Sequence, residues 1–332
     1  MLLMRFMHPR SLALLAGGRT PEHDLSLESA NALTQALAGS HWNATLITVN
    51  RSGEFPMADP VAALRSYDYV LPLVRGAQGE GLHGLLDAFE IPVLGEGSTT
   101  AAVTIDKPLA KRLLREAGLP VLGHAIVHRR QLAASARDVC AMIAREVGFP
   151  CFVKPASGVA SSGAGVVWEA RELSAALFRA AAWDSRILVE PFVDAREIEV
   201  AVIGGVPSFP GELVFRSEHH DYETKRNADR LELIIPAMVD EDERERLRDL
   251  AVAACAALGV EVVGRVEILR DRNTRELFIN EVNAAPAFQP AAPFGRLWEA
   301  SGLSPARVLD RLASACDARV RDRFRNQVAP GV

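Results

Sequence analysis

The sequence contains little cysteine and no long hydrophobic run. Its four cysteines are scattered along 332 residues, and their spacing matches neither a metal-ligand pair nor a disulfide scaffold. This usage predicts a reduced protein of the cytoplasm. No stretch approaches the roughly 20 consecutive apolar residues that are needed to cross a bilayer, so we expect no membrane as a partner. The cysteines are Cys140, Cys151, Cys255 and Cys316.

An excess of positive charge is also missing. The formal net charge is -5, whereas a protein that binds the phosphate backbone of nucleic acid needs a basic surface. We therefore expect no nucleic acid as a partner. Hydrophobic residues make up 49% and charged residues 24% of the chain, which is typical of an ordinary globular protein. The length predicts roughly two or three domains.

Strand and helix patterns alternate through the first hundred residues. This order predicts a parallel α/β sheet, in which ligands gather at the carboxyl ends of the strands. The start of the chain superficially resembles a signal peptide, but its short apolar run leads into Gly17–Gly18, so we expect a buried first strand instead. The strand patterns lie at 12–18, 45–50, 67–74 and 91–95, and the helical patterns at 25–37 and 82–89.

Nearer the C-terminus, two short strand patterns joined by a polar turn predict a β-hairpin over 263–288. Side chains alternate along a strand, so Arg265 and Glu267 share one side of the first strand. Glu281 and Asn283 likewise share one side of the second. Two carboxylates and a carboxamide on one surface suit Mg2+, which takes one or two carboxylates and completes its shell with phosphate and water. The alternative interpretation is the solvated face of an ordinary hairpin.

A glycine- and serine-rich stretch at 157–165 follows the buried strand pattern that ends in Lys154. Small residues let backbone N–H groups approach a polyphosphate closely, although a plain turn between strands also explains such a stretch. Lys154, directly before the loop, and Lys107, early in a helix predicted over 107–117, are both placed to meet phosphate charge. No P-loop pattern of the form GxxxxGKS or GxxxxGKT occurs. Together with the carboxylate pair, these features predict an ATP site.

These motifs are similar, in the same order, to those of a known family. The chain resembles ATP-grasp enzymes of the D-alanine–D-alanine ligase family over nearly its whole length. The resemblance implies an α/β ATP-grasp fold of three domains, 1–97, 98–187 and 188–332, of which the first is Rossmann-like. The matching segments are GGRTPEHDLSLESA at 17–30, LPLVRGAQGEGLHGLL at 71–86, DKPLAKRLLREAGLPV at 106–121, FVKPASGVASSGAGVV at 152–167, LVEPFVDAREIEVAVIGG at 188–205, DYETK at 221–225, and GRVEILRD with FINEVNAAPAF in the hairpin.

The resemblance also implies roles for residues around ATP and two Mg2+ ions. Lys107 and Lys154 would hold the phosphates, under the loop around Ser161. Glu190 and the backbone near Phe192 would face adenine, and Glu197 would face the ribose. The implied metal ligands are Glu267, where the family usually has Asp, Glu281 and Asn283, and Lys225 completes the implied ATP-binding set.

Two chemical steps follow from the same resemblance. The carboxylate of a first amino acid takes the γ-phosphoryl group of ATP, and the amine of a second amino acid attacks the acyl phosphate. The implied catalytic residues are Glu22, which would bind the first ammonium group, Ser161 of the loop, and Arg265, which would stabilise the acyl phosphate. The implied substrate-binding residues are Glu22, Arg75, Tyr222, Arg226, Ala287 and Gln289.

The chain departs from the family where the amino acids bind. The family's His-Gly reads Arg75-Gly76, and Arg226 replaces a Tyr of the family's lid motif. Ala292 stands where the family has a Ser that receives the second carboxylate, and the loop serine is either Ser161 or Ser162. Arginine forks two hydrogen bonds onto a carboxylate or phosphate. We therefore predict a larger or more acidic substrate than D-alanine.

Three functional alternatives remain open from the sequence. The first is a specialised ligase making another dipeptide, a depsipeptide or a ring-closed product. The second is an ordinary D-alanine–D-alanine ligase of peptidoglycan synthesis, in which Arg75 and Arg226 point to solvent or pair with acidic neighbours. The third is a non-catalytic ATP-binding relative, against which Arg265 argues, because a pure binder does not need it. By family analogy, we also expect a homodimer.

Overall fold

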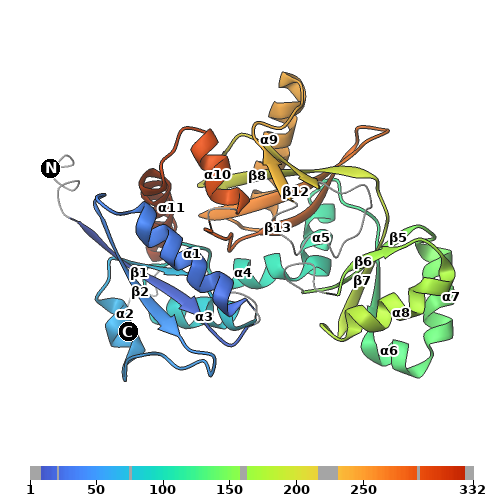
Figure 1. The fold of residues 1–332 in the computed structure, drawn as a ribbon, viewed down its shortest axis with the longest axis horizontal. Helices are drawn as coiled ribbons and strands as arrows, with labels where there is room; N and C mark the ends of the chain where they lie inside the picture. The colour runs from blue at the N-terminus through green and yellow to red at the C-terminus, as the bar shows by residue number, and fades with distance from the viewer. Residues whose placement is uncertain are drawn as a thin grey trace.

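The computed structural model describes residues 9–20, 22–74, 77–157, 163–215, 231–289 and 292–325. Their strands form three sheets, which lie one after another along the longest axis of the molecule, with α4 and α5 passing between them (Figure 1). This arrangement of mixed α/β layers agrees with the predicted fold class. The two connecting helices are α4 (Ser98–Ile105) and α5 (Lys107–Glu116).

The N-terminal sheet is parallel, as predicted, with the strand order β2-β1-β3. The predicted strand at 91–95 is wrong, because Val93 forms only an isolated bridge with Val70. Pro92 has no N–H to continue a ladder, which explains why pairing stops there. The elements are β1 (Arg10–Gly17), β2 (Trp42–Val49), β3 (Tyr69–Pro72), α1 (His23–Ala36), α2 (Pro60–Arg65) and α3 (Ala77–Ala88).

The second sheet has the order β4-β7-β5-β6 and is antiparallel. Its helices pack their apolar sides on one face, around Val127, Val153 and Val189. Because neighbouring residues alternate between faces, Lys154 and Glu190 lie on the opposite face. The elements are β4 (Ala125–His128), β5 (Cys151–Pro155), β6 (Gly165–Val167), β7 (Arg186–Pro191), α6 (Arg129–Ala134), α7 (Ala136–Glu146) and α8 (Ala170–Ala181).

The third sheet contains the predicted hairpin, β12 with β13, in the antiparallel order β11-β10-β8-β12-β13. Asp240 caps the following helix by accepting a hydrogen bond from the N–H of Glu243. The elements are β8 (Ala195–Ile203), β9 (Val206–Pro207), β10 (Gly211–Phe215), β11 (Leu231–Ile234), β12 (Val263–Asp271), β13 (Leu277–Asn283), α9 (Glu241–Ala257), α10 (Pro293–Ala300) and α11 (Pro305–Arg325).

Helix α5 packs on the third sheet through Ala110 and Leu114. Its start is as predicted, because the Asp106 side chain accepts a hydrogen bond from the N–H of Leu109 at 3.1 Å. This cap places Lys107 in the first helical turn, beside β13. The predicted domain limits of 1–97, 98–187 and 188–332 stay a prediction.

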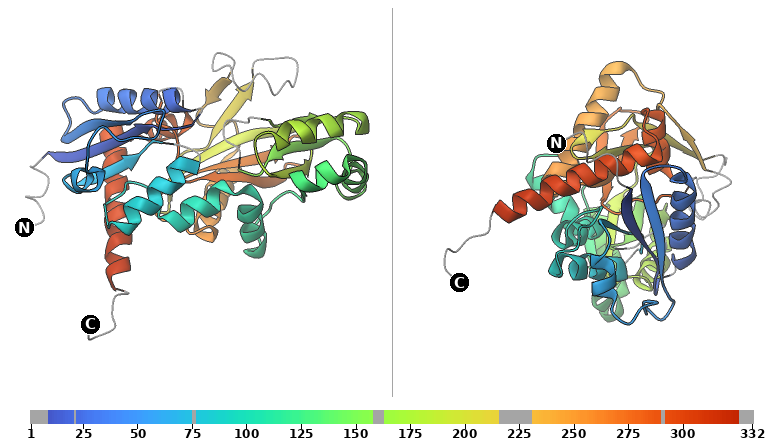
Figure 2. Two further views of the ribbon diagram at one scale, coloured as in Figure 1. Left: turned by 90° about the horizontal axis from the view of Figure 1, so that it is seen from below. Right: turned by 90° about the vertical axis from the view of Figure 1, so that its left-hand side faces the viewer.

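One hydrophobic core joins the two ends of the chain. Leu12 and Leu14 of β1 share a buried cluster with Trp298 of α10 and with Leu309 and Leu312 of α11. Beyond this cluster, α11 extends past the rest of the described chain (Figure 2). None of the helices within the described ranges is both long and apolar enough to span a membrane.

Candidate active site

Three glutamates lie side by side on neighbouring strands of the third sheet. In the pairing of β12 with its two neighbours, Glu267 lies opposite Glu199 on one side and opposite Glu281 on the other. Arg265 and Asn283 form the next row on the same face, since they lie opposite each other and residues two apart share a face. The structure thus brings together all four hairpin side chains that the sequence singled out.

Like charges directly opposite each other on a sheet repel, and here each glutamate has a donor of its own. Two of these donors, Arg265 and Lys107, are cations, and the third is the carboxamide of Asn280. These donors offset part of the repulsion along the row. The three contacts are Arg265 to Glu199, Asn280 to Glu267, and Lys107 to Glu281 at 3.5 Å.

Arg265 and Glu199 form a buried ion pair. The side chain of Glu199 is 0% exposed and that of Arg265 is 16% exposed. Burial raises the pKa of Glu199 to about 7, although the Arg265 charge opposes that rise. Burial alone would lower the pKa of Arg265, but the facing glutamates outweigh it and raise that pKa. One buried oxygen of Glu199 has no hydrogen-bond partner among the described residues, so this carboxylate depends on Arg265.

The two predicted phosphate lysines approach β13 from different elements. Lys154 is the penultimate residue of β5, and its Nζ donates to Oδ1 of Asn280 at 3.0 Å. The ammonium group of Lys107, on α5, lies beside Glu281. Because β4, α6 and α7 separate α5 from β5 along the chain, the fold rather than local sequence brings both cations to the predicted metal ligands.

Glu190 lies between two lysines in the interior. Its Oε1 is 2.7 Å from Nζ of Lys111, and its Oε2 is 2.7 Å from Nζ of Lys154. Burial alone would raise the pKa of Glu190, but the two ammonium groups lower it to about 2. Burial lowers the pKa of Lys111. The carboxylate of Glu190 thus orders the lysines, while its predicted place beside adenine stays a prediction.

Stability should fall at low pH because of Glu190. Its folded-state pKa of about 2 lies below the ordinary value of 4.5, so its contribution is complete above pH 4.5 and is lost as the pH falls through 2. Between pH 7 and pH 3, the free energy of unfolding of the wild type should fall by about 2 kcal/mol more than that of Glu190→Gln. Urea unfolding at the two pH values measures this difference. Glu116→Gln, an exposed change on α5, is the control. Equal losses in the wild type and Glu190→Gln would contradict the assignment.

Phe192 lies on the connection from β7 of the second sheet to β8 of the third, and Glu197 lies on β8 itself. The resemblance places the nucleoside beside these two residues. The N–H of Phe192 donates to the carbonyl of Pro150 at 3.0 Å, and its ring centroid is 5.2 Å from that of Trp168. Glu197 precedes Glu199 by two residues on β8, so it lies on the same face as the glutamate row.

The turn after α8 holds both described ends of the glycine- and serine-rich stretch. Ser157 donates from its backbone N–H and its Oγ to Oδ2 of Asp184, at 2.8 and 2.5 Å. At the other end, Gly163 has a φ of 76°, and an added Cβ would lie 2.4 Å from the ring of Trp183. Only glycine fits there, so Asp184 and Trp183 set the positions of Ser157 and Gly163.

Gln289 contacts α1, the helix that Glu22 immediately precedes. Glu22 is 4% exposed and immediately precedes α1. Nε2 of Gln289 donates to the carbonyl of Leu25 on α1 at 2.9 Å, and Ala287 precedes Gln289 in the same loop. Ala292 is the N-cap of α10 and makes no side-chain hydrogen bond to that helix. The loop that carries Ala287 and Gln289 therefore contacts the helix that follows Glu22.

Five of the predicted site residues lie outside the described residues, so their roles stay predictions. They belong to three parts of the sequence: residues 75–76, the glycine- and serine-rich stretch, and residues 216–230. They are Arg75, Ser161, Tyr222, Lys225 and Arg226, together with the alternative loop serine Ser162.

The donor set at the hairpin fits Mg2+. No group of three or more His, Cys, Asp or Glu that could hold a metal occurs in the part of the chain that the structure describes, but Mg2+ bound with a nucleotide needs only one or two carboxylates. Glu267 and Glu281, opposite each other, supply these. Oδ1 of Asn283 accepts a hydrogen bond from the N–H of Ala285 at 2.9 Å, which orients its carboxamide beside them.

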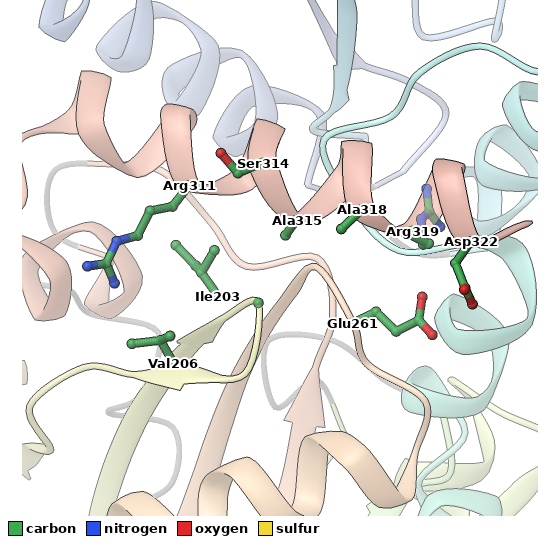
Figure 3. Close-up of a pocket in the computed structure, with 10 residues that line it drawn as sticks. Ile203, Val206, Glu261, Arg311, Ser314, Ala315, Ala318, Arg319 and Asp322 are labelled. Carbon is green, nitrogen blue, oxygen red and sulfur yellow. The ribbon is translucent and has the colours of Figure 1, made fainter. Parts of the chain in front are cut away.

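A separate groove of about 540 Å³ lies between α11 and the β8–β9 turn (Figure 3). Arg311 and Arg319 line it together with Glu261 and Asp322, so its charges are mixed. None of the predicted site residues within the described ranges lines this groove. It is therefore no part of the candidate site.

Three residues of the site were missed by sequence reasoning. Lys111 stands four residues after Lys107, one helical turn along α5, and this spacing could have revealed it. Glu199 follows the period-two pattern of β8 and could have been found in the same way. Asn280 is one residue out of step with Glu281, so alternation would have placed it on the opposite face.

Comparison with known sequences identifies a family. The family profile described as D-ala D-ala ligase C-terminus matches residues 113–314. The D-alanine–D-alanine ligase of Deinococcus radiodurans is 35% identical over 330 residues, covering 91% of this chain and 97% of that protein. The D-alanine–D-alanine ligase of Heliobacterium modesticaldum is 31% identical over 358 residues, covering 96% and 98%.

Solved structures show the same fold. The D-alanine–D-alanine ligase from Coxiella burnetii superposes with a TM-score of 0.80 at 24% identity, covering 96% of this chain and 97% of that one. The VanG D-Ala:D-Ser ligase from Enterococcus faecalis superposes with a TM-score of 0.80 at 26% identity, covering 93% and 100%.

Proposed function

Because the chain belongs to the D-alanine–D-alanine ligase family and is an ATP-grasp ligase that forms a C–N bond, we propose that it joins two amino acids at the β12–β13 hairpin, next to the second sheet. The observation that carries this location is the convergence of Lys107 and Lys154 with Glu267 and Glu281. These four side chains come from four different elements and reach one surface. Phosphate-binding cations beside a carboxylate pair are what Mg·ATP requires.

In this proposal the chain's own residues position and neutralise the reacting groups. The first carboxylate attacks the γ-phosphorus, releasing ADP and forming an acyl phosphate. The second amine then attacks the acyl carbon, loses a proton and displaces phosphate. Lys107 and Lys154 hold the phosphate oxygens, and Arg265 stabilises the acyl phosphate and the tetrahedral intermediate. Positioning and charge neutralisation account for most of the rate in such transfers.

The family uses ATP and Mg2+, and we assign Glu267, Glu281 and Asn283 to two Mg2+ ions. Bound Mg2+ neutralises charge on the phosphates during transfer. Glu267 is longer than the Asp usual in the family, and Asn280 bonds to its carboxylate. This bond restricts the extra freedom of the longer side chain. Lys225, Glu190, Phe192 and Glu197 complete the proposed nucleotide site.

We further assign the chain a second substrate other than D-alanine. Ala292 begins α10 without a side-chain hydrogen bond, so the hydroxyl that the family offers to the second carboxylate is missing. Arg75 and Arg226 add charge at the positions of a His and a Tyr. The D-Ala:D-Ser ligase among the structural neighbours supports the idea that this fold accepts other second substrates. The curated relatives named D-alanine–D-alanine ligase support the ordinary peptidoglycan enzyme as the second candidate.

ADP release with a panel of D- and L-amino acids, with products identified by mass, tests this assignment. We expect turnover with D-alanine as both substrates to be slower than turnover with D-alanine and a larger or more acidic second amino acid. Ala292→Ser should raise the use of D-alanine as second substrate, because it restores a hydroxyl donor. Robust turnover with D-alanine alone, unchanged in Ala292→Ser, would instead establish the ordinary ligase.

Three further properties belong to the same proposal. They are the homodimeric state, by family analogy, the cytoplasmic location predicted from cysteine usage, and the domain limits at 97/98 and 187/188. Sedimentation of the purified protein tests the first of these directly, and a monomer at micromolar concentration would remove it.

A further inference from the structure

The β12–β13 hairpin contains one extra residue, and that residue is Asn280. Glu267 lies opposite Glu281, but the next residue of β12, Ile268, lies opposite Ile279. Asn280 therefore has no partner of its own on β12 and forms a β-bulge. Such a bulge bends the strand locally and can turn a side chain to the other face of the sheet. In this way Asn280 reaches the face that carries Glu267 and Glu281.

Contacts on the open edge of β13 hold this bulge in place. The N–H of Ile279 donates to the carbonyl of Pro120 at 2.8 Å, in the loop after α5. The carbonyl of Ile279 accepts from Nζ of Lys111 at 3.5 Å. The side chain of Ile279 is fully buried. The residue before Asn280 is thus fixed on both its backbone and its side chain.

The carboxamide of Asn280 bridges the two halves of the proposed site. Its Oδ1 accepts a hydrogen bond from Nζ of Lys154 at 3.0 Å, and its Nδ2 donates to Oε1 of Glu267. The chemistry of the neighbours fixes this orientation, because an ammonium group only donates and a carboxylate only accepts. Among side chains of this size, only asparagine offers one acceptor and one donor on a rigid plane.

We propose that Asn280 is a positioning residue that keeps Lys154 and Glu267 apart while orienting both. Without a neutral group between them, the ammonium and the carboxylate would pair directly. Each would then be turned away from its ligand, Lys154 from phosphate and Glu267 from Mg2+. With Asn280 in place, Lys154 has a donor left beyond those used on Glu190 and Asn280. This inference rests on the proposed ATP and Mg2+ site.

Asn280→Leu removes both hydrogen bonds at nearly constant size. Changing a residue that hydrogen-bonds to a metal ligand typically costs about 10–100-fold in metal affinity or activity. We expect calorimetry to show a loss of about 10–100-fold in the affinity for Mg·ADP, and a clearly smaller loss for ADP in EDTA. Turnover should need a correspondingly higher Mg2+ concentration for half-saturation. Asn273→Leu, the same change in the exposed turn of this hairpin, should match the wild type.

Thermal melting without ligand separates positioning from folding. If Asn280→Leu fails to fold, Asn280→Ala is the second variant, because water can fill the polar gap that alanine leaves. It should likewise lose more affinity for Mg·ADP than for ADP in EDTA. If a folded variant keeps the wild-type affinity for Mg·ADP and the wild-type Mg2+ dependence, the positioning role of Asn280 is refuted. The proposed function would be unaffected. Failure of the wild type to bind Mg·ADP would overturn the proposed function and this inference with it.

Discussion

Replacing Arg265 by alanine should reduce turnover by about 10³–10⁵-fold, the range for an arginine that stabilises charge during phosphoryl transfer. The guanidinium group lies on the same face as Glu267 and Glu281 and is the one residue of the hairpin assigned to the acyl phosphate. Steady-state ADP release with the best amino-acid pair measures the effect. Arg265→Lys should recover only part of the rate, because lysine keeps the charge but loses the planar fork.

Loss of Arg265 should also destabilise the fold, and this effect has to be separated from catalysis. Removing one partner of a buried ion pair costs about 3–5 kcal/mol, and Glu199 is fully buried. The double variant Arg265→Ala/Glu199→Gln should regain most of the free energy of unfolding, because no charge is left unpaired. Its turnover should stay as low as that of the single variant. Recovery of turnover together with stability would show that Arg265 only supports the fold.

Glu281→Gln should lower Mg2+-dependent turnover by about 10²–10³-fold, the cost of removing one preorganised electrostatic group. Glutamine keeps the size and one oxygen but loses the charge that would face Mg2+ and the Lys107 ammonium. The measurement is the rate of ADP release as Mg2+ is titrated. Glu276→Gln, at the exposed turn of the same hairpin, serves as the matched control. Unchanged Mg2+-dependent turnover in Glu281→Gln would mean that the hairpin carries no metal.

Local rules were enough to predict most of the elements. The hairpin follows from alternation in β12 and β13, and α5 and α9 begin where Asp106 and Asp240 predict caps. The predicted strand at 91–95 fails because an apolar run reports burial rather than pairing. Val93 is indeed buried, but it pairs with a neighbour only once.

The polar contacts of the site follow from tertiary structure and could be predicted only in part. Alternation correctly joins Arg265 with Glu267 and Glu281 with Asn283, since these pairs lie two residues apart. It places Asn280 on the wrong face, because a bulge moves one side chain to the other face of the sheet and the sequence pattern does not indicate the bulge. The contact of Glu190 with two lysines depends on how β5, β7 and α5 pack, which no local pattern specifies.

The core shared by Leu12, Leu14, Trp298 and Leu309 has a consequence for synthesis of the chain. A ribosome delivers β1 first and α11 last. One face of the first sheet is then covered only in part, by α1, until almost the whole polypeptide has emerged. The second sheet has no such dependence, because its own helices α6, α7 and α8 cover it. The middle of the nascent protein can therefore fold before its beginning, and the first hundred residues are the part that needs protection from aggregation.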